Sequence, residues 1–566
     1  MKMKACMGMA LSVLAMLSIV FLPGCTGNGS NQTAVVEQEI PHLEKRGDVT
    51  QLIVNGKPWL ALAGELHNSS SSTEKYMVNI WPKLKATNLN TVLAVISWEQ
   101  VEPEEGKFDF SVVDDLLKGA RQYDMKVMIL WFGAWKNGIT SYVPDWVQKD
   151  QNRFPLVRTK EGNTLSILST LGEETAKADA RAYGEMMKYL SEVDKERTTI
   201  MIQMQNEVGL HGDTRDYHPK AVEAFNGPVP QQLMDYLIAN DGKKLLPEQQ
   251  AAWDKAGHRT SGTWEQVFGK GDYTDELFMA WNYARYLDVV AKAGKEVYPL
   301  PTFVNAWIVQ PEDKHPGDYP SGGPQAQNHD VWRAGAPNID ILSPDIYLPD
   351  FPNILQMYSR LGNPVFIPES SAGVAGSANA FYAIGQLGAI GYSPFGIESR
   401  VADPATEPLT RAYATLASLS DMILEHQAAG TIRGAWLKLQ NPTIKEMTHS
   451  LGNYDVKFAL RTTRNSPVLP AMGYGLVMLV GPDEYLVAGH EVEVTFQPKS
   501  GQGIAGLAKV QAGDVIDGEW VPSRWLNGDE IQLRYDLKQA QRENLSGQGL
   551  RFRGDTSLQR VWLYNY

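Results

Sequence analysis

Eight short apolar segments constrain the fold of this chain more than any other feature of its sequence. They are too short for helices, several are rich in Val and Ile, and most lack strict alternation, which is typical of parallel strands covered on both faces. Segments with helical spacing lie between them, and eight strand–helix repeats predict a closed (β/α)8 barrel. The segments are Trp59–Leu66, Thr91–Ser97, Lys126–Phe132, Thr198–Gln205, Thr302–Trp307, Ile339–Asp345, Pro364–Pro368 and Ala389–Pro394.

The intervening segments carry apolar residues three or four positions apart, the spacing of one helix face. A doubly wound open sheet is the competing fold, but no Gly-rich dinucleotide loop follows the first apolar segment. The predicted helices are Ser72–Thr87, Ser111–Tyr123, Glu173–Val193, Glu276–Ala293, Asn353–Leu361, Ala378–Leu387 and Thr406–His426.

The pattern changes near residue 430, where helical spacing gives way to short strand-like runs. In one of them Val492, Val494 and Phe496 alternate with polar residues, and Gly481-Pro482-Asp483 is typical of a turn. The fold class that we predict is therefore α/β, a TIM barrel over residues 46–429 followed by an all-β sandwich over residues 430–566. Residues 210–275 are a long insertion in the barrel, with one helical piece expected near Gln231–Ile238.

The amino terminus has the features of an export signal. Two lysines precede a mostly apolar stretch from Ala10 to Leu22, which predicts a signal peptide over residues 1–24 and a tether over residues 25–45. The signal ends Leu22-Pro23-Gly24-Cys25, which resembles a bacterial lipobox and implies that Cys25 carries a lipid. We expect an exported protein anchored to a bacterial membrane, and Thr26 favours the outer membrane over the inner one. A plain signal peptide with an incidental cysteine is the alternative.

Charge and composition exclude several classes of partner. The formal net charge of −13 and the lack of a basic stripe argue against nucleic acid, and a neutral polysaccharide suits this charge better than a polyanionic one. Cleavage of the signal would leave Cys25 as the only cysteine, so no internal disulfide and no cysteine metal site can form. The histidines show no short ligand spacing, so we expect no metal and no organic cofactor.

Two glutamates stand where apolar segments stop. Glu207 ends the run 198–207, and Glu369 ends the run Pro-Val-Phe-Ile-Pro-Glu. These positions lie at the carboxyl ends of the fourth and seventh predicted strands, the end at which barrel enzymes place their chemistry. Breaking a glycosidic bond needs one carboxyl group that holds a proton and another that stays ionised, so the pair suits displacement at a sugar carbon. Taken alone, either glutamate would suit a capping or ion-paired role better than a catalytic one.

The Asn206-Glu207 pair on strand four, together with Glu369 on strand seven, resembles the clan of retaining barrel glycosidases. This resemblance implies that Glu207 is the acid/base, that Glu369 is the nucleophile and that Asn206 binds the sugar 2-hydroxyl.

Two further motifs resemble the β-galactosidases of glycoside hydrolase family 35, in particular its bacterial branch with a β-sandwich tail. The first is Gly64-Glu65-Leu66-His67-Asn68-Ser69-Ser70, and the second runs from Trp98-Glu99 to Phe108-Asp109-Phe110. Family 42 β-galactosidases share much of the second motif. Many family 35 members also carry an Ala-Glu pair at the end of strand three, where this chain has Phe132-Gly133-Ala134-Trp135. We expect Trp135 at about the position of that carboxylate, where an indole could stack on a sugar face.

Other strand-end residues are candidates for sugar binding, although core packing is the usual role of a tryptophan. Tyr347 could donate a hydrogen bond to the nucleophile, and Glu398 could bind sugar or pair with Arg400. Glu65 could hold a sugar hydroxyl or form a buried ion pair. The candidate substrate-binding residues are Asn206, Glu65, Trp131, Trp135, Asn305, Trp307, Tyr347, Tyr392 and Glu398.

The sequence thus predicts a lipid-anchored, retaining exo-β-galactosidase that acts on neutral plant polysaccharide side chains, such as those of xyloglucan, or on oligosaccharides. A retaining β-glycosidase with another sugar specificity is the first alternative, because the end of strand three departs from the family pattern. A non-catalytic glycan-binding surface lipoprotein is the second. The sequence leaves the oligomeric state open.

Overall fold

The computed structural model describes residues 38–461, 469–533 and 546–566 of the chain. The predicted signal peptide and Cys25 lie outside the described residues. Among the described helices, none is both long enough and apolar enough to cross a membrane.

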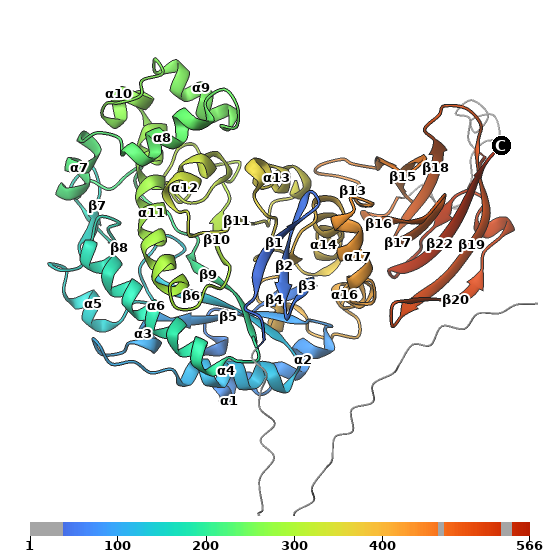
Figure 1. Ribbon diagram of the computed structural model, residues 1–566, viewed down its shortest axis with the longest axis horizontal. Helices are drawn as coiled ribbons and strands as arrows, with labels where there is room; N and C mark the ends of the chain where they lie inside the picture. The colour runs from blue at the N-terminus through green and yellow to red at the C-terminus, as the bar shows by residue number, and fades with distance from the viewer. Residues whose placement is uncertain (1–37, 462–468, 534–545) are drawn as a thin grey trace, which may run out of the picture. The chain divides into compact units, whose positions relative to one another are not determined.

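Seven parallel strands form the barrel sheet in the order β11-β10-β9-β6-β5-β4-β12 (Figure 1). The segment around the seventh predicted strand joins the two ends of this sheet through isolated parallel bridges, Ile346 with Ser370 and Ile367 with Tyr392. The predicted fold class, a TIM barrel followed by all-β strands, is confirmed. The strands are β4 (Ala61–Glu65), β5 (Thr91–Ser97), β6 (Lys126–Lys136), β9 (Thr199–Asn206), β10 (Thr302–Trp307), β11 (Ile341–Asp345) and β12 (Gly391–Tyr392).

Side chains alternate between two apolar layers along these strands, as the pleat of a strand requires. Leu130 and Phe132 of β6 belong to the cluster inside the barrel, whereas Ile129 and Trp131 belong to the cluster between the barrel and its helices. Both layers are buried, which explains why the strand sequences are apolar without strict alternation.

Helices cover the outside of the barrel (Figure 1). The predicted helix Ser72–Thr87 is instead divided into α1 and α2, because Pro82 is tolerated in the first turn of α2 but would interrupt a continuous helix. The helices along the barrel are α1 (Glu74–Met77), α2 (Trp81–Ala86), α3 (Trp98–Val101), α4 (Ser111–Gln122), α5 (Asp145–Lys149), α6 (Glu173–Val193), α11 (Asp272–Lys295), α12 (His329–Gly335), α13 (Phe351–Tyr358), α14 (Gly373–Leu387), α15 (Ile397–Arg400), α16 (Pro408–Ser418) and α17 (Ser420–Ala428). Short 3-10 helices span Ser70–Ser72, Ala326–Asn328, Arg360–Gly362 and Gly528–Glu530, and β7 (Leu156–Arg158) pairs with β8 (Thr164–Leu168).

The insertion after β9 is more helical than the sequence indicated. It forms α7 (Pro219–Asn226), α8 (Gln231–Asn240), α9 (Pro247–Lys255) and α10 (Trp264–Phe268), drawn in green in Figure 1. Prolines begin α7 and α9, which favours the first helical turn over an irregular loop.

A small antiparallel sheet precedes the barrel and corrects the predicted tether, which was placed over residues 25–45. Residues 42–45 are in fact part of β1 (His42–Arg46), which pairs with β2 (Val49–Val54), and β3 (Lys57–Trp59) completes the sheet. Gln51 of β2 is buried and donates to Leu424 O at 2.8 Å, so this sheet is attached to the barrel helices.

Two antiparallel sheets form the carboxyl-terminal part. Apolar residues between them make a separate core, and Trp436 on the other face of the six-stranded sheet donates from Nε1 to Asn379 Oδ1 of α14 at 2.9 Å. The six-stranded sheet is β13 (Ile432–Lys438), β16 (Met472–Gly481), β17 (Glu484–His490), β22 (Ser557–Asn565), β19 (Ala505–Ile516) and β20 (Glu519–Trp525). The four-stranded sheet is β14 (Glu446–Leu451), β15 (Tyr454–Leu460), β18 (Val492–Pro498) and β21 (Leu550–Arg551).

Candidate active site

The structure brings Glu207 and Glu369 together at the carboxyl end of the barrel strands. Glu207 follows β9, and Glu369 lies between the two bridges that close the barrel. A third acid, Asp345 at the end of β11, joins them: one carboxyl oxygen from each residue lies within 4.8 Å of the other two. All three side chains are buried. The two predicted carboxyls therefore face each other, and the third was not among the predicted site residues.

The end of β9 is held in an irregular conformation. Gln205 and Glu207 have φ values of 60° and 45°, which non-glycine residues adopt rarely and often at functional sites. Gln205 Oε1 accepts the backbone N–H of Gly133 at 3.0 Å and of Trp135 at 3.1 Å, which ties β9 to β6. A Cβ on Gly133 would lie 2.7 Å from an oxygen of Asp179, so this close approach requires glycine. The local geometry of Glu207 is thus fixed from the neighbouring strand.

Asn305 of β10 connects three strand ends through one amide. Its Oδ1 accepts the backbone N–H of Glu207 at 3.0 Å. Its Nδ2 donates to Asp345 Oδ2 at 2.7 Å, to Asn206 Oδ1 at 3.1 Å and more weakly to Glu369 Oε1 at 3.4 Å. The predicted residues Asn206 and Asn305 therefore lie in the acid cluster, where Asn305 positions the acids from within the protein.

Tyr347 follows β11 and donates its hydroxyl to Glu369 Oε2 at 3.0 Å. The Tyr347 side chain is 47% exposed, so it lies at the rim of the site with its hydroxyl turned toward the buried carboxyl. Because a carboxylate is stabilised by the donors around it, this bond favours the ionised form of Glu369.

The surroundings separate the proton affinities of the two glutamates. Burial, and then the negative charge of Glu369, raise the pKa of Glu207 to about 8. Burial also raises the pKa of Glu369, but Lys136 at the end of β6 and the Tyr347 hydroxyl lower it. Lys136 and Tyr347 therefore favour the ionised form of Glu369, whereas the surroundings of Glu207 favour its protonated form, which is the division of roles that an acid and a nucleophile need.

Glu65 and Glu398 extend the acidic cluster toward β4. Neither oxygen of the buried Glu65 accepts a hydrogen bond from a described residue, and burial raises its pKa well above the usual value. Glu398 Oε1 accepts from the His67 backbone N–H at 2.9 Å and from Ser70 Oγ at 2.6 Å. The alternative pairing of Glu398 with Arg400 is wrong, because Arg400 donates to Phe395 O instead.

Three predicted sugar contacts pack elsewhere in the core. The ring of Trp131 lies outside the barrel sheet, and its Nε1 donates to Asp179 Oδ1 at 2.8 Å. The ring of Trp135, only 1% exposed, packs on Tyr286 at a centroid distance of 4.4 Å. The hydroxyl of Tyr392 donates to Ser371 O at 2.7 Å, and its side chain is fully buried. The predicted roles of Trp131, Trp135 and Tyr392 in sugar binding are therefore wrong.

Trp307 and Lys136 remain at the open end of the barrel. Trp307 is half-buried, and the ring of His211 meets it edge-on at a centroid distance of 5.4 Å. Lys136 acts electrostatically on Glu65, Glu207 and Glu369, which places its charge beside the cluster. Lys136 was not predicted; it follows directly after Trp135, and the next position along a strand points to the opposite face.

The three acids also have the geometry of a cation site, since each offers an oxygen within 4.8 Å of the others. A hard divalent cation would need these carboxyl groups to be ionised. In this cluster the pKa values of Glu207, Asp345 and Glu369 are all raised by burial. The arrangement thus favours holding protons over holding a metal ion.

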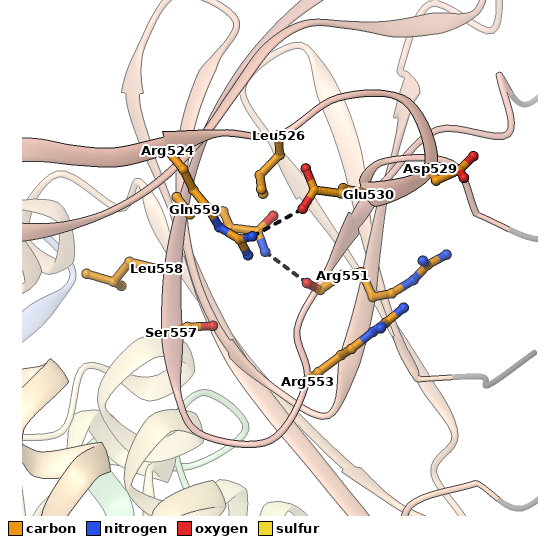
Figure 2. A pocket seen from close by; sticks show the side chains of 10 residues that line it. Arg524, Leu526, Asp529, Glu530, Arg551, Arg553, Ser557, Leu558 and Gln559 are labelled. Carbon is orange, nitrogen blue, oxygen red and sulfur yellow. Dashed lines mark hydrogen bonds and ion pairs between the residues drawn. The ribbon is translucent and has the colours of Figure 1, made fainter.

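A separate cavity of about 440 Å³ lies in the β-sandwich (Figure 2). Two of its arginines pair with acids: Arg524 Nη1 lies 3.1 Å from Glu530 Oε1, and Arg551 Nε lies 3.4 Å from Glu493 Oε1. Figure 2 shows Gln559 joined to the backbone of Arg551, so this polar side chain stabilises the strands around the cavity. The cavity holds no equivalent of the coupled acids in the barrel.

Comparisons of the sequence with known proteins point to one group. Residues 67–267 match the model of the Glyco_hydro_42 family, described as Beta-galactosidase, and residues 409–538 match a domain of unknown function, DUF5597. Beta-galactosidase 14 of Arabidopsis thaliana is 30% identical over 142 residues, which are 22% of this chain and 15% of that protein. A beta-galactosidase of Xanthomonas manihotis is 37% identical over 67 residues, 12% of this chain and 11% of that protein. The chain thus matches only a small part of the length of these relatives.

Solved structures show a distant likeness. A beta-galactosidase from Marinomonas ef1 aligns with a TM-score of 0.45 at 12% identity, covering 65% of this chain and 62% of that one. One from Bacillus circulans sp. alkalophilus aligns with a TM-score of 0.43 at 14% identity, covering 65% and 57%. The matching family model is that of family 42, so the resemblance to family 35 is not confirmed. The segment that carries Glu207 is thereby related to β-galactosidases.

Proposed function

We propose that this chain is a retaining β-galactosidase that releases terminal, non-reducing β-D-galactose. The observation that carries the proposal is the approach of the Glu207 and Glu369 carboxyl oxygens to within 4.8 Å at the catalytic end of a barrel. Retaining glycosidases have carboxyls about 5–5.5 Å apart, whereas inverting enzymes need about 6.5–9.5 Å to admit a water. The short separation supports double displacement.

In the first step the Glu369 carboxylate attacks the anomeric carbon while Glu207 gives its proton to the leaving oxygen. A glycosyl ester forms on Glu369 and the C–O bond to the leaving group breaks. The ester removes the negative charge of Glu369, which lowers the pKa of Glu207 and stabilises its ionised form. In the second step Glu207 takes a proton from water, the hydroxide displaces Glu369, and both carboxyls return to their starting states.

Replacing either carboxyl with an amide tests these roles. Glu207→Gln and Glu369→Gln should each lower kcat/KM on an aryl β-galactoside by about a hundred- to ten-thousand-fold or more. Glu104→Gln is the matched control, because this glutamate is exposed and pairs with Lys107 on the surface. Azide should restore turnover of Glu207→Ala and give a β-galactosyl azide. Near-normal turnover by either Gln variant, or an α-azide product, would overturn the proposal.

The identity of the sugar is the finer part of the proposal. Trp135 packs in the core, so it supplies no stacking surface in place of the family carboxylate, and Lys136 brings a cation to that strand end instead. We propose β-galactose within neutral plant polysaccharide side chains, such as those of xyloglucan, or within oligosaccharides. A panel of aryl β-galactoside, β-glucoside, β-mannoside and α-L-arabinopyranoside tests this, and a clear preference for a non-galactoside would redirect the assignment.

We further propose that the chain is exported and anchored through a lipid on Cys25, on the basis of the Leu22-Pro23-Gly24-Cys25 run. Expression in a bacterium supplied with labelled palmitate should label the wild-type protein and leave Cys25→Ser unlabelled. Equal labelling of both proteins, or of neither, would contradict the anchor.

A further inference from the structure

A third carboxyl, Asp345, lies beside the two proposed catalytic groups and has no role in the double displacement described above. It ends β11 and is 3% exposed. One of its oxygens lies within 4.8 Å of both Glu207 and Glu369. Since a buried carboxyl is costly unless it is paired or protonated, its state needs an explanation.

The hydrogen bonds of Asp345 leave one of its two buried oxygens without a donor. Its Oδ2 accepts one bond, from Asn305 Nδ2 at 2.7 Å, while its Oδ1 receives none from an amide or hydroxyl of the described residues. An oxygen of its side chain nevertheless lies within 4.8 Å of a carboxyl oxygen of Glu207, so the two acids face each other. A hydrogen bond between two carboxyl groups requires that at least one of them carries a proton.

The charges around Asp345 favour the neutral form. Glu369 from the seventh strand segment, Glu207 from β9 and Glu65 from β4 all act on it with negative charge, and Glu398 after β12 adds to this on Glu65. Lys136 from β6 is the cation beside the cluster, and the neutral Tyr347 hydroxyl and Asn305 amide complete the surroundings. Burial, followed by these charges, raises the pKa of Asp345 well above its usual value.

We propose that Asp345 is a positioning residue that stays neutral and donates a hydrogen bond to the Glu207 carboxyl throughout the reaction. The inference rests on the proposed glycosidase activity. In the free enzyme the bond holds the proton-bearing Glu207 toward the leaving oxygen. Once Glu207 has given up that proton, the same bond stabilises its carboxylate, and the Asp345 proton itself is not transferred. A carboxylic acid kept neutral by its surroundings can serve as a donor in this way.

Two substitutions distinguish a neutral donor from an ordinary ionised aspartate. Asp345→Asn keeps an N–H donor toward Glu207 and an oxygen acceptor for Asn305, whereas Asp345→Leu has a similar size and neither group. With a neutral donor, Asp345→Asn should retain wild-type kcat/KM within a few-fold and leave the alkaline limb of its pH profile in place. Asp345→Leu should lower kcat by about tenfold or more, the loss expected for one hydrogen bond to a carboxylate.

The direction in which the alkaline limb of the kcat/KM profile moves shows whether Asp345 is neutral or ionised. The Asp345 bond lowers the pKa of Glu207, so its loss in Asp345→Leu raises that pKa and moves the alkaline limb of kcat/KM to higher pH. An ionised Asp345 would instead raise the pKa of Glu207 by its charge, and Asp345→Asn would then move the limb to lower pH. That shift in Asp345→Asn, or a uniform loss in both variants without any shift, would overturn the proposal.

Leaving-group dependence separates this inference from the proposed function. Asp345→Leu should lose more activity on a galactoside with a poor leaving group, which needs acid assistance, than on one with an activated leaving group. Glu207→Gln measured beside it tests the function: full activity in Glu207→Gln would overturn the glycosidase mechanism, whereas an inactive Glu207→Gln with an unaffected Asp345→Leu would overturn the role of Asp345 alone. Melting temperatures show that each variant is folded, and Asp345→Asn decides the question if Asp345→Leu does not fold.

Discussion

The hydrogen bond from Tyr347 to Glu369 predicts a pH-dependent defect when the hydroxyl is removed. Tyr347→Phe deletes a donor that lies 3.0 Å from Glu369 Oε2 and leaves the ring in place. The bond lowers the pKa of Glu369, so its loss raises that pKa. Because Glu369 must be ionised to attack, the acid limb of kcat/KM should move to higher pH.

The size of this effect follows from the exposure of the side chain. A hydrogen bond to a charged group contributes about 1.5–3 kcal/mol. Tyr347 is 47% exposed, so water can replace part of the lost bond and the lower value applies. About 1.4 kcal/mol corresponds to one pKa unit and a tenfold change in rate, so we expect a shift of about one pH unit. The loss of kcat/KM in Tyr347→Phe should reach about tenfold at pH values below the acid limbs of both wild type and variant, and it should shrink as pH rises above them.

Initial rates on an aryl β-galactoside between pH 4 and pH 8, at substrate concentrations well below KM, measure this directly. Tyr189→Phe is the matched control, since it removes a phenol that donates to Asp114 at 2.8 Å on the surface. A uniform loss at every pH would refute the reasoning, because it would indicate misplacement of the ring and not a change in the ionisation of Glu369. An equal shift in Tyr189→Phe would refute it as well.

Three further predictions concern the stability of the site and its scaffold. The folded-state pKa of Glu207 is raised to about 8, so the stability that its protonated form contributes is full below the unfolded value of about 4.3 and is lost as pH rises toward 8. Glu207→Gln should therefore raise Tm relative to wild type more at pH 8 than at pH 5. A Tm of Glu207→Gln at pH 8 that is no higher than that of wild type would contradict this. Gly133→Ala places a Cβ 2.6 Å from Gln205 Nε2 and should cost about 1–3 kcal/mol in denaturant unfolding together with reduced activity, whereas unchanged values would show that β6 can shift freely. Trp436→Ala removes a fully buried indole and its bond to Asn379, and should cost about 3–5 kcal/mol; a loss below about 1 kcal/mol would mean that the β-sandwich does not support α14.

The sequence could predict the positions of four site residues, Glu207, Glu369, Asn305 and Tyr347. All barrel strands are parallel, so residues near their carboxyl ends lie at the same end of the barrel. Glu207, Glu369 and Tyr347 end or follow an apolar segment, and Asn305 lies two residues before the end of one. The carboxyl ends of all barrel strands meet at one face. Residues almost a hundred positions apart, such as Glu207 and Asn305, are therefore in contact at 3.0 Å. Hydrophobic pattern and strand count sufficed for this part of the site.

The face on which each side chain lies could not be predicted in the same way. Barrel strands are buried on both faces, so hydrophobicity does not tell inside from outside. Trp131 and Trp135 belong to the cluster between the barrel and its helices, whereas Leu130 and Phe132 belong to the cluster inside the barrel. A tryptophan at a strand end is thus a weak indicator of a sugar site without the register of its strand.

The same two-residue period could have identified Asp345. Ile341 lies inside the barrel, and Asp345 lies four residues further along β11 with the same parity. In the same way Glu65 lies two residues after Ala63, and Asn305 two residues after Phe303. The sequence did not show which of the two sets of alternate positions faces the inside of the barrel, because both faces of each strand are equally apolar.

The end of strand three is the main departure from the family 35 pattern, and its electrostatics bear on the proposed mechanism. An additional carboxylate there would add negative charge beside Glu369 and raise its pKa further, since burial has already raised it. Lys136 acts in the opposite direction and lowers the pKa of Glu369, which favours the ionised nucleophile. Compared with that pattern, this strand end lacks a carboxylate that could bind sugar hydroxyls and carries a cation that lowers the pKa of Glu369. It follows that this departure bears on which sugar the site accepts more than on whether the site can break a glycosidic bond.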